Sequence, residues 1–162
     1  MFVALTLRPL LTQSLSSAAF AAYGQVIYPQ PDGKAFDQHD AQLVLDKGSP
    51  RFYLMRLGAR GRRFDRITQH RRCTQCLGSL HAQPWLLAVA PPSPQLDPDQ
   101  IVGFRIAGDC FVKLHLETWH AGPLFAEPAF IDFYNLELTD TNLVDHTTVD
   151  LQETHQLTFE FQ

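Results

Sequence analysis

The order of apolar and polar residues predicts a chain built mainly of short strands. In the segment 157–161, Leu157, Phe159 and Phe161 alternate with polar residues, which is typical of a strand with one buried face. The run 85–90 is apolar throughout and indicates a strand covered on both sides. Further strands are predicted for the runs 25–28, 52–57, 101–106, 111–116 and 130–136.

One short helix is predicted near the start of the chain. Ser14 is a candidate N-cap, a leucine and several alanines follow at helical spacing, and Gly24 provides the stop. Many short strands, eleven prolines and so little helix predict an all-β fold, which is a sandwich, jelly roll or barrel. No repeat or linker divides the chain, so we expect residues 1–162 to form a single domain.

Composition and charge narrow the class of protein. With 45% apolar residues, 19% charged residues and a formal charge of −4, the chain is typical of a globular protein that does not bind nucleic acid. Its start lacks the basic region of a secretory signal, and no run reaches the roughly 18 apolar residues of a membrane span. Three cysteines are too few for a disulfide framework. We expect a cytoplasmic protein with no membrane or nucleic-acid partner.

The first candidate chemistry lies in the segment 111–120. On a strand, Lys113 and His115 would share one face, opposite Val112. Because lysine rarely points into a core, Lys113 is expected either on a solvent face or in a polar cavity inside a barrel. His120 adds a second imidazole where a strand ends.

Positive charge and two cysteines mark the middle of the chain. Seven of the ten arginines lie between Arg56 and Arg72, which suggests that one or two of them bind a small anion while the others are solvated. Cys73 and Cys76 have the spacing of a zinc or redox pair, but no further ligand pair or strand-to-helix turn accompanies them. We interpret both as small buried residues.

Three stretches of the chain together resemble one known family. They are LSSAAFAAYGQVI at 15–27, HRRCTQ at 70–75 followed by the apolar run 85–90, and HLETWH at 115–120 followed by PLF at 123–125. In this order they resemble the ureidoglycolate lyases, small enzymes of the cupin class. The resemblance reaches from near the start of the chain to about residue 142. It implies a cupin-like double-stranded β-helix, or jelly-roll barrel, with one short N-terminal helix.

The resemblance also implies which residues form the site. In cupins, a metal or a small acid lies inside the barrel, held by histidines from neighbouring strands, and imidazole suits a divalent nickel, zinc or manganese ion. The implied candidates are, for catalysis, His70, His115, His120 and Lys113; for substrate binding, Gln75, Arg66 and Trp119; and for the metal, His70, His120 and His115.

Two departures from the family pattern bear on activity. Thr68 and Gln69 stand where the family has a glutamate and an arginine, and Ala121 stands where it has a second histidine after the tryptophan. An alternative is therefore a catalytically silent cupin that binds a small carboxylate as a sensor or partner-binding module.

The reaction that the resemblance implies is an elimination. Ureidoglycolate carries a hydroxyl and a ureido nitrogen on the carbon beside its carboxylate, and its cleavage gives glyoxylate and urea. A base takes the hydroxyl proton while an acid protonates the leaving nitrogen, and imidazole does either near neutral pH. We therefore expect a carbon–nitrogen lyase of purine (allantoin) degradation that acts on ureidoglycolate or a related small 2-hydroxy acid. A homodimer is also expected, with the N-terminal helix and the edge of the strand 157–161 as its surfaces.

Overall fold

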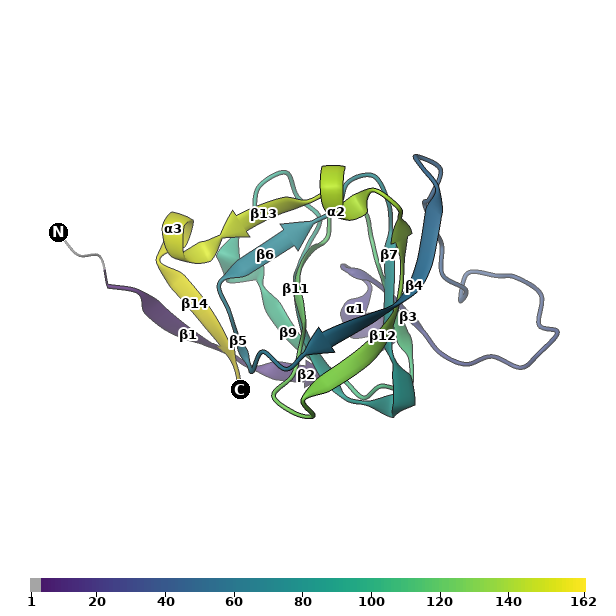
Figure 1. Cartoon of the computed structure of the whole chain (residues 1–162), viewed down its shortest axis with the longest axis horizontal. Coiled ribbons are helices and arrows are strands. Elements are labelled where there is room, and N and C mark those ends of the chain that lie inside the picture. Colours follow the sequence, from purple (N-terminus) through teal and green to yellow (C-terminus); the bar gives the residue numbers. More distant parts are fainter. Residues whose placement is uncertain (1–3) are drawn as a thin grey trace.

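The computed structural model describes residues 4–162 and contains three β-sheets (Figure 1). The five-stranded sheet contains, in spatial order, β3 (Gly24–Ile27), β10 (Phe111–Leu114), β7 (Gln75–Ser79), β12 (Phe130–Leu138) and β4 (Pro50–Gly58). The six-stranded sheet contains β13 (Thr147–Asp150), β6 (Arg66–Gln69), β11 (Trp119–Leu124), β8 (Trp85–Ala90), β9 (Val102–Ile106) and β2 (Thr12–Ser14). The three-stranded sheet contains β1 (Thr6–Leu10), β14 (Leu157–Phe161) and β5 (Arg63–Phe64).

The five- and six-stranded sheets face each other and enclose the main apolar core. Leu77 and Phe133 from the first sheet pack in one buried cluster with Leu87, Val89 and Phe104 from the second. All five side chains are essentially removed from water, so this burial supplies a large share of the stability. The mainly β fold predicted from the sequence is confirmed.

A second apolar core lies on the outer side of the six-stranded sheet. There Phe159 and Phe161 of β14 pack with Phe64 and Trp119. The alternation predicted for the strand 157–161 is therefore correct. Its edge is not free, however, because β14 lies between β1 and β5. The predicted dimer surface along this strand edge is wrong for that reason.

The N-terminal helix is shorter than predicted and has a different cap. Helix α1 spans Ser17–Phe20, and the Ser16 hydroxyl, rather than that of Ser14, accepts a hydrogen bond from the Ala19 amide at 3.2 Å. Gly24 does not end the helix but begins β3. A Cβ at Gly24 would lie 1.9 Å from the Lys113 carbonyl oxygen, so a glycine is needed there for β10 to approach.

The remaining helical segments are short. They are α2 (Thr141–Val144), α3 (Leu151–His155) and the 3₁₀ turns η1 (Leu80–Ala82) and η2 (Pro98–Gln100). No helix among residues 4–162 is long and apolar enough to cross a membrane. Helix α2 lies at one end of the two facing sheets, between the ends of β12 and β13 (Figure 1).

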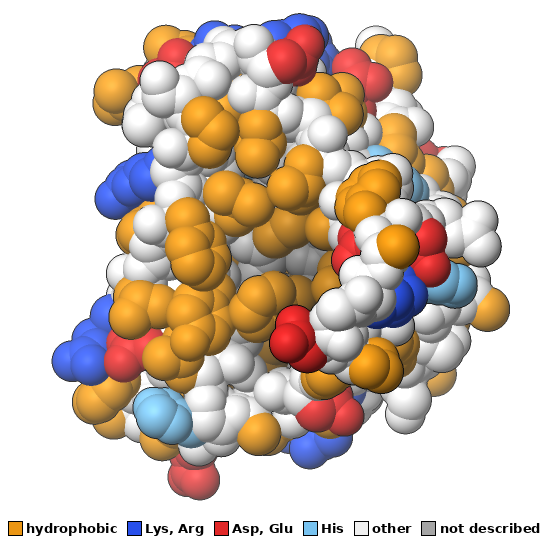
Figure 2. Space-filling model, turned by 90° about the vertical axis from the view of Figure 1, so that its right-hand side faces the viewer, with side chains coloured by type: hydrophobic (Ala, Val, Ile, Leu, Met, Phe, Trp, Pro, Cys, Tyr) orange, Lys and Arg blue, Asp and Glu red, His pale blue; other side chains and the backbone are white. Residues whose placement is uncertain are grey.

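The outer face of the five-stranded sheet carries exposed apolar side chains. Phe52 and Leu54 of β4 and Phe130 of β12 are 64%, 58% and 49% exposed. Figure 2, which views the molecule from this side, shows a hollowed apolar surface with a projecting segment beside it. The projecting segment belongs to the connection 28–49, between β3 and β4.

Candidate functional site

Two histidines meet inside the fold, between the two facing sheets. On β11, His120 is paired with Val89 of β8, so its side chain shares the inner face with that core residue. His70 follows the end of β6 directly. The ring centroids lie 5.0 Å apart, and each residue is only 8% exposed. The structure thus brings together two of the predicted site residues from separate strands.

Backbone carbonyls orient both imidazole rings. Nδ1 of His70 lies 2.5 Å from the Asp145 carbonyl oxygen, and Nδ1 of His120 lies 3.3 Å from that of Thr118. A carbonyl only accepts, so each Nδ1 carries a hydrogen and donates it, which leaves each Nε2 for other chemistry. Burial, followed by the proximity of His70, lowers the pKa of His120 from 6.5 to about 3. His120 is therefore a neutral hydrogen-bonding group at physiological pH.

A buried polar network projects into the same interior from the five-stranded sheet. The Gln75 amide donates to Asn135 Oδ1 at 3.1 Å and to Glu137 Oε2 at 3.2 Å. The Asn135 amide donates to the Tyr53 hydroxyl at 3.1 Å, and that hydroxyl donates to Glu137 Oε1 at 3.4 Å. These residues lie on the inner face because Gln75 and Asn135 pair with the core residues Leu114 and Leu77.

One short segment links this network to the histidine pair. Asn142 of α2 donates to Glu137 Oε1 at 3.3 Å, and three residues later the Asp145 carbonyl accepts from His70. Both groups therefore lie at the end of the interior that α2 covers. The network is also incomplete, because Gln75 Oε1 is buried and has no hydrogen-bond partner among residues 4–162. A buried acceptor without a partner is costly and would be satisfied by a donor on a ligand.

Lys113 and His115 lie elsewhere, on the outer face of the five-stranded sheet. Lys113 pairs with Gln25 of β3 and Cys76 of β7, while its neighbour Val112 points into the core. The predicted shared face is correct, since Lys113 Nζ is 3.0 Å from His115 Nδ1. Neither predicted location for Lys113 is correct. It is 3% exposed and thus not on a solvent face, and it is outside the interior.

Two residues predicted to bind substrate are placed away from the histidine pair. The Arg66 side chain is 72% exposed and contacts the Asp150 carboxylate at 3.4 Å. Trp119 is buried in the second apolar core, on the opposite face of β11 from His120, and its indole nitrogen donates to the Ser93 carbonyl at 3.2 Å. The geometry therefore does not support either assignment. Four more arginines of the cluster form surface ion pairs: Arg56 with Asp132, Arg63 with Glu160, Arg71 with Glu117 and Arg72 with Asp140.

Two of the three positions that depart from the family pattern, Thr68 and Gln69, have hydrogen-bond partners here. The Thr68 hydroxyl lies 2.8 Å from that of Thr148 on the neighbouring strand β13. The buried Gln69 amide donates to the carbonyls of Ser93 and Glu117, both at 3.0 Å. Gln69 thus ties two loops together rather than supplying charge to the site.

The predicted three-histidine metal set is not formed. His115 is bonded to Lys113 on the outer face, and no group of three His, Cys, Asp or Glu side chains that could hold a metal occurs within residues 4–162. Catalytic divalent ions usually have three protein ligands, whereas the histidine pair offers two Nε2 atoms. Within the described residues, the histidine pair alone therefore supplies fewer ligands than such an ion usually has. Cys73 and Cys76 are buried, as predicted, and Cys110 is buried too.

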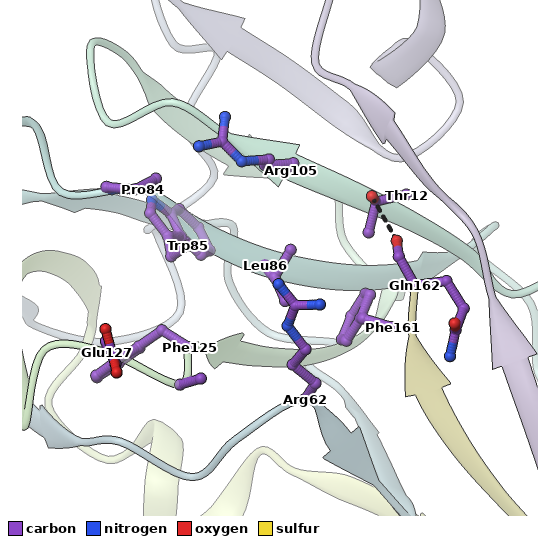
Figure 3. A pocket seen from close by; sticks show the side chains of 11 residues that line it. Thr12, Arg62, Pro84, Trp85, Leu86, Arg105, Phe125, Glu127, Phe161 and Gln162 are labelled. Atoms are coloured by element: carbon purple, nitrogen blue, oxygen red, sulfur yellow. Dashed lines mark hydrogen bonds between the residues drawn. The ribbon is translucent and has the colours of Figure 1, made fainter.

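A cavity of about 500 Å³ lies on the outer side of β8. Figure 3 shows Arg62 and Arg105 at this cavity, together with Trp85 and Phe125. None of the residues predicted for the site lines it. We therefore do not assign the reaction to this cavity.

Two facing sheets that bring His70 and His120 together between them are typical of a cupin-like β protein. A comparison with protein families matches residues 7–158 to the model described as ureidoglycolate lyase. The chain belongs to the ureidoglycolate lyase family, which has the cupin-like fold. Membership supports a lyase that acts on a small molecule derived from purine breakdown. No curated protein matches the chain.

The sequence reasoning missed Tyr53, Asn135, Glu137 and Asn142 in the interior. A signal for two of them was present in β12. On its inner face, Ile131 and Phe133 are followed at the same spacing by Asn135 and Glu137. A face that changes from apolar to polar within one strand indicates a buried polar site.

Proposed function

We propose that this protein cleaves ureidoglycolate to glyoxylate and urea at the polar end of the interior. The observation that carries this proposal is the His70–His120 pair, 5.0 Å apart, at the same end as a buried network with an unused acceptor. Proton transfer and ureido recognition are the two tasks of the reaction, and these groups supply both.

His70 is the proposed proton carrier. Its Nε2 takes the proton of the substrate hydroxyl as the carbon–nitrogen bond breaks and the hydroxyl carbon becomes a carbonyl. The electron pair of the broken bond stays on the ureido nitrogen, which receives the same proton from the imidazolium, so the cycle needs no net acid or base. Nδ1 of His70 stays bound to the Asp145 carbonyl, which holds the ring in place.

His120 orients the substrate in this proposal. A pKa of about 3 keeps the ring uncharged, so its Nε2 accepts a hydrogen bond without competing for the proton. A charge on His120 would also repel the imidazolium that forms on His70.

The Gln75 network is the proposed ureido subsite. A ureido group presents several N–H donors, and Gln75 Oε1 is a buried acceptor without a partner. Glu137 is also buried and accepts only from neutral amide and hydroxyl groups. Donors of the substrate would complete the hydrogen bonding of both residues. The proposal assigns no step to a metal.

A glyoxylate-release assay on purified protein tests this function. Wild-type protein should release glyoxylate from ureidoglycolate, and His70→Asn should lower kcat by about 10² to 10⁴, the usual contribution of a placed proton carrier. Arg66→Lys is the matched control outside the interior and should leave kcat unchanged. Glu137→Gln keeps the side-chain shape and should raise KM more than it lowers kcat. Wild-type protein without turnover, or His70→Asn with full turnover, would overturn the proposal.

We further propose that the protein works in the cytoplasm as a homodimer. Three free cysteines support a reducing compartment. Closed two-fold dimers are the commonest soluble assemblies. The exposed Phe52, Leu54 and Phe130 on one face favour the outer side of the five-stranded sheet as the contact.

A further inference from the structure

A buried lysine without a carboxylate partner lies outside the proposed active site. Lys113 is 3% exposed and, within the part of the chain that the structure describes, forms no ion pair. Its ammonium group has one hydrogen-bond partner, Nδ1 of His115 at 3.0 Å. Buried lysines are normally paired with an acid, so a structural role alone does not explain this one.

The histidine beside Lys113 is set to accept a proton. Nε2 of His115 lies 3.2 Å from the Ala21 carbonyl oxygen, so it carries a hydrogen and donates. Nδ1 then holds a lone pair that faces the lysine. His115 therefore offers a base within hydrogen-bond distance of Nζ.

The segment 37–42 covers the side chains of Lys113 and His115. Gln25, which neighbours Lys113 across the sheet, donates to the carbonyls of Gln38 and Asp40 at 3.2 and 3.3 Å. Its oxygen accepts from the Gln42 amide at 2.9 Å. The two acids of this segment, Asp37 and Asp40, form no ion pair with Lys113, because they contact Lys34 at 2.8 and 3.8 Å.

A cavity of about 380 Å³ opens at this position. It is lined by Lys113 and His115 from one side and by Gln38, His39 and Gln42 from the cover. The space exceeds what a molecule of five or six heavy atoms needs, and its lining combines apolar surface from Ala21 and Val26 with these polar side chains and no carboxylate. Such a cavity suits a small polar ligand that presents an electrophile to the lysine.

We propose that Lys113 and His115 form a second reactive site, in which the lysine amine binds a small aldehyde such as glyoxylate as an imine. The Nζ lone pair attacks the carbonyl carbon and the carbonyl electron pair moves to the oxygen. Nζ loses a proton to His115 Nδ1, which returns it to the oxygen. The resulting hydroxyl takes a second proton from solvent and leaves as water while the carbon–nitrogen double bond forms, which gives a protonated imine. No oxidant or reductant is required.

The electrostatics favour the reactive form of the lysine. Burial lowers the pKa of Lys113, although the Cys76 thiol beside it acts in the opposite direction. Burial and the charge of Lys113 likewise lower the pKa of His115. A free amine is the nucleophile in imine formation, so both effects increase the reactive fraction near neutral pH.

The chain offers internal controls, because Lys34 and Lys47 are its two other lysines. Lys34 is ion-paired, and that contact raises its pKa. Incubation with glyoxylate and borohydride at pH 7, followed by peptide mass analysis, should add one carboxymethyl group to Lys113. We expect an excess of label on Lys113 over Lys34, because burial lowers the pKa of the Lys113 amine while the contact with Asp37 raises that of Lys34.

Two variants complete this test. Lys34→Arg with Lys47→Arg leaves Lys113 as the only lysine, and labelling of the double variant should be undiminished. His115→Asn should slow the labelling of Lys113 and leave that of Lys34 unchanged. Equal labelling of all three lysines, or none at Lys113, would overturn the proposal. That glyoxylate is the natural aldehyde rests on the proposed function. The labelling itself uses added glyoxylate, so it succeeds or fails independently of lyase turnover.

Discussion

At the scale of single residues, the order of motifs in the sequence placed some candidate site residues correctly in the interior and misplaced others. His70 and His120 were predicted as partners and meet across two strands. Gln75 was also expected to line the interior and does so. Trp119 could not be assigned in this way, because adjacent residues on a strand face opposite sides and only the pairing shows which side is the interior.

The burial of Lys113 could not be predicted from its neighbours in the sequence. Its alternation with Val112 was evident, but its burial depends on a cover from the segment 37–42, some seventy positions earlier in the chain. No local pattern predicts that such a segment folds back over an outer face. The two predicted locations were therefore both wrong.

His120 should make stability depend on pH. Its pKa is about 3 when folded and 6.5 otherwise, so the unfolded chain binds the extra proton between these values. Above about pH 6.5 His120 therefore does not lower the free energy of unfolding, and below that pH the free energy of unfolding falls as the pH drops towards 3. At pH 5 the loss from this residue is about 2 kcal/mol.

Thermal unfolding at pH 7.5 and pH 5 measures this effect. Wild-type Tm should fall by roughly 4 to 8 °C more than that of His120→Asn, which lacks the titrating ring. The other shifted groups are common to both proteins and cancel in the comparison. An equal fall in both proteins would show that His120 does not titrate as described.

At the scale of elements, long apolar strands were predictable and short polar ones were not. The predicted runs 52–57 and 130–136 correspond to β4 and β12, each longer in the structure. Strands β6 and β13 went unnoticed because Arg66–Gln69 and Thr147–Asp150 carry few apolar residues. Pairing with each other stabilises them, and pairing partners cannot be read from composition.

At the scale of elements, one prediction concerns the stability contributed by the apolar strand β8. Leu87 is fully buried in the main core, whereas its neighbour Leu86 is only partly buried on the other face. Leu87→Ala should lower the free energy of unfolding by about 2 to 5 kcal/mol. Leu86→Ala is the matched control and should cost less, as denaturant titration would reveal. The reverse order would mean that the two faces of β8 are wrongly assigned.

At the scale of the whole molecule, the exposed apolar face of the five-stranded sheet predicts the assembly. Light scattering should give twice the chain mass at micromolar concentration. Phe52→Lys with Leu54→Glu, on the outer face of the edge strand β4, should shift the mass to that of one chain. Arg63→Lys, on the three-stranded sheet, should not change it. A single-chain mass for the wild type would remove the dimer from the proposal.

The parallel pairing of β1 with β14 joins positions about 150 residues apart, from Thr6 with Leu157 to Leu10 with Phe161. During synthesis, β1 leaves the ribosome first and has no partner until nearly the whole chain has been made. The second apolar core, to which Leu10 and Phe161 both belong, cannot close before then. Contacts so distant in sequence slow folding. The N-terminal strand therefore remains unpaired and exposed to other chains for longer than any other part of the sheet that it completes.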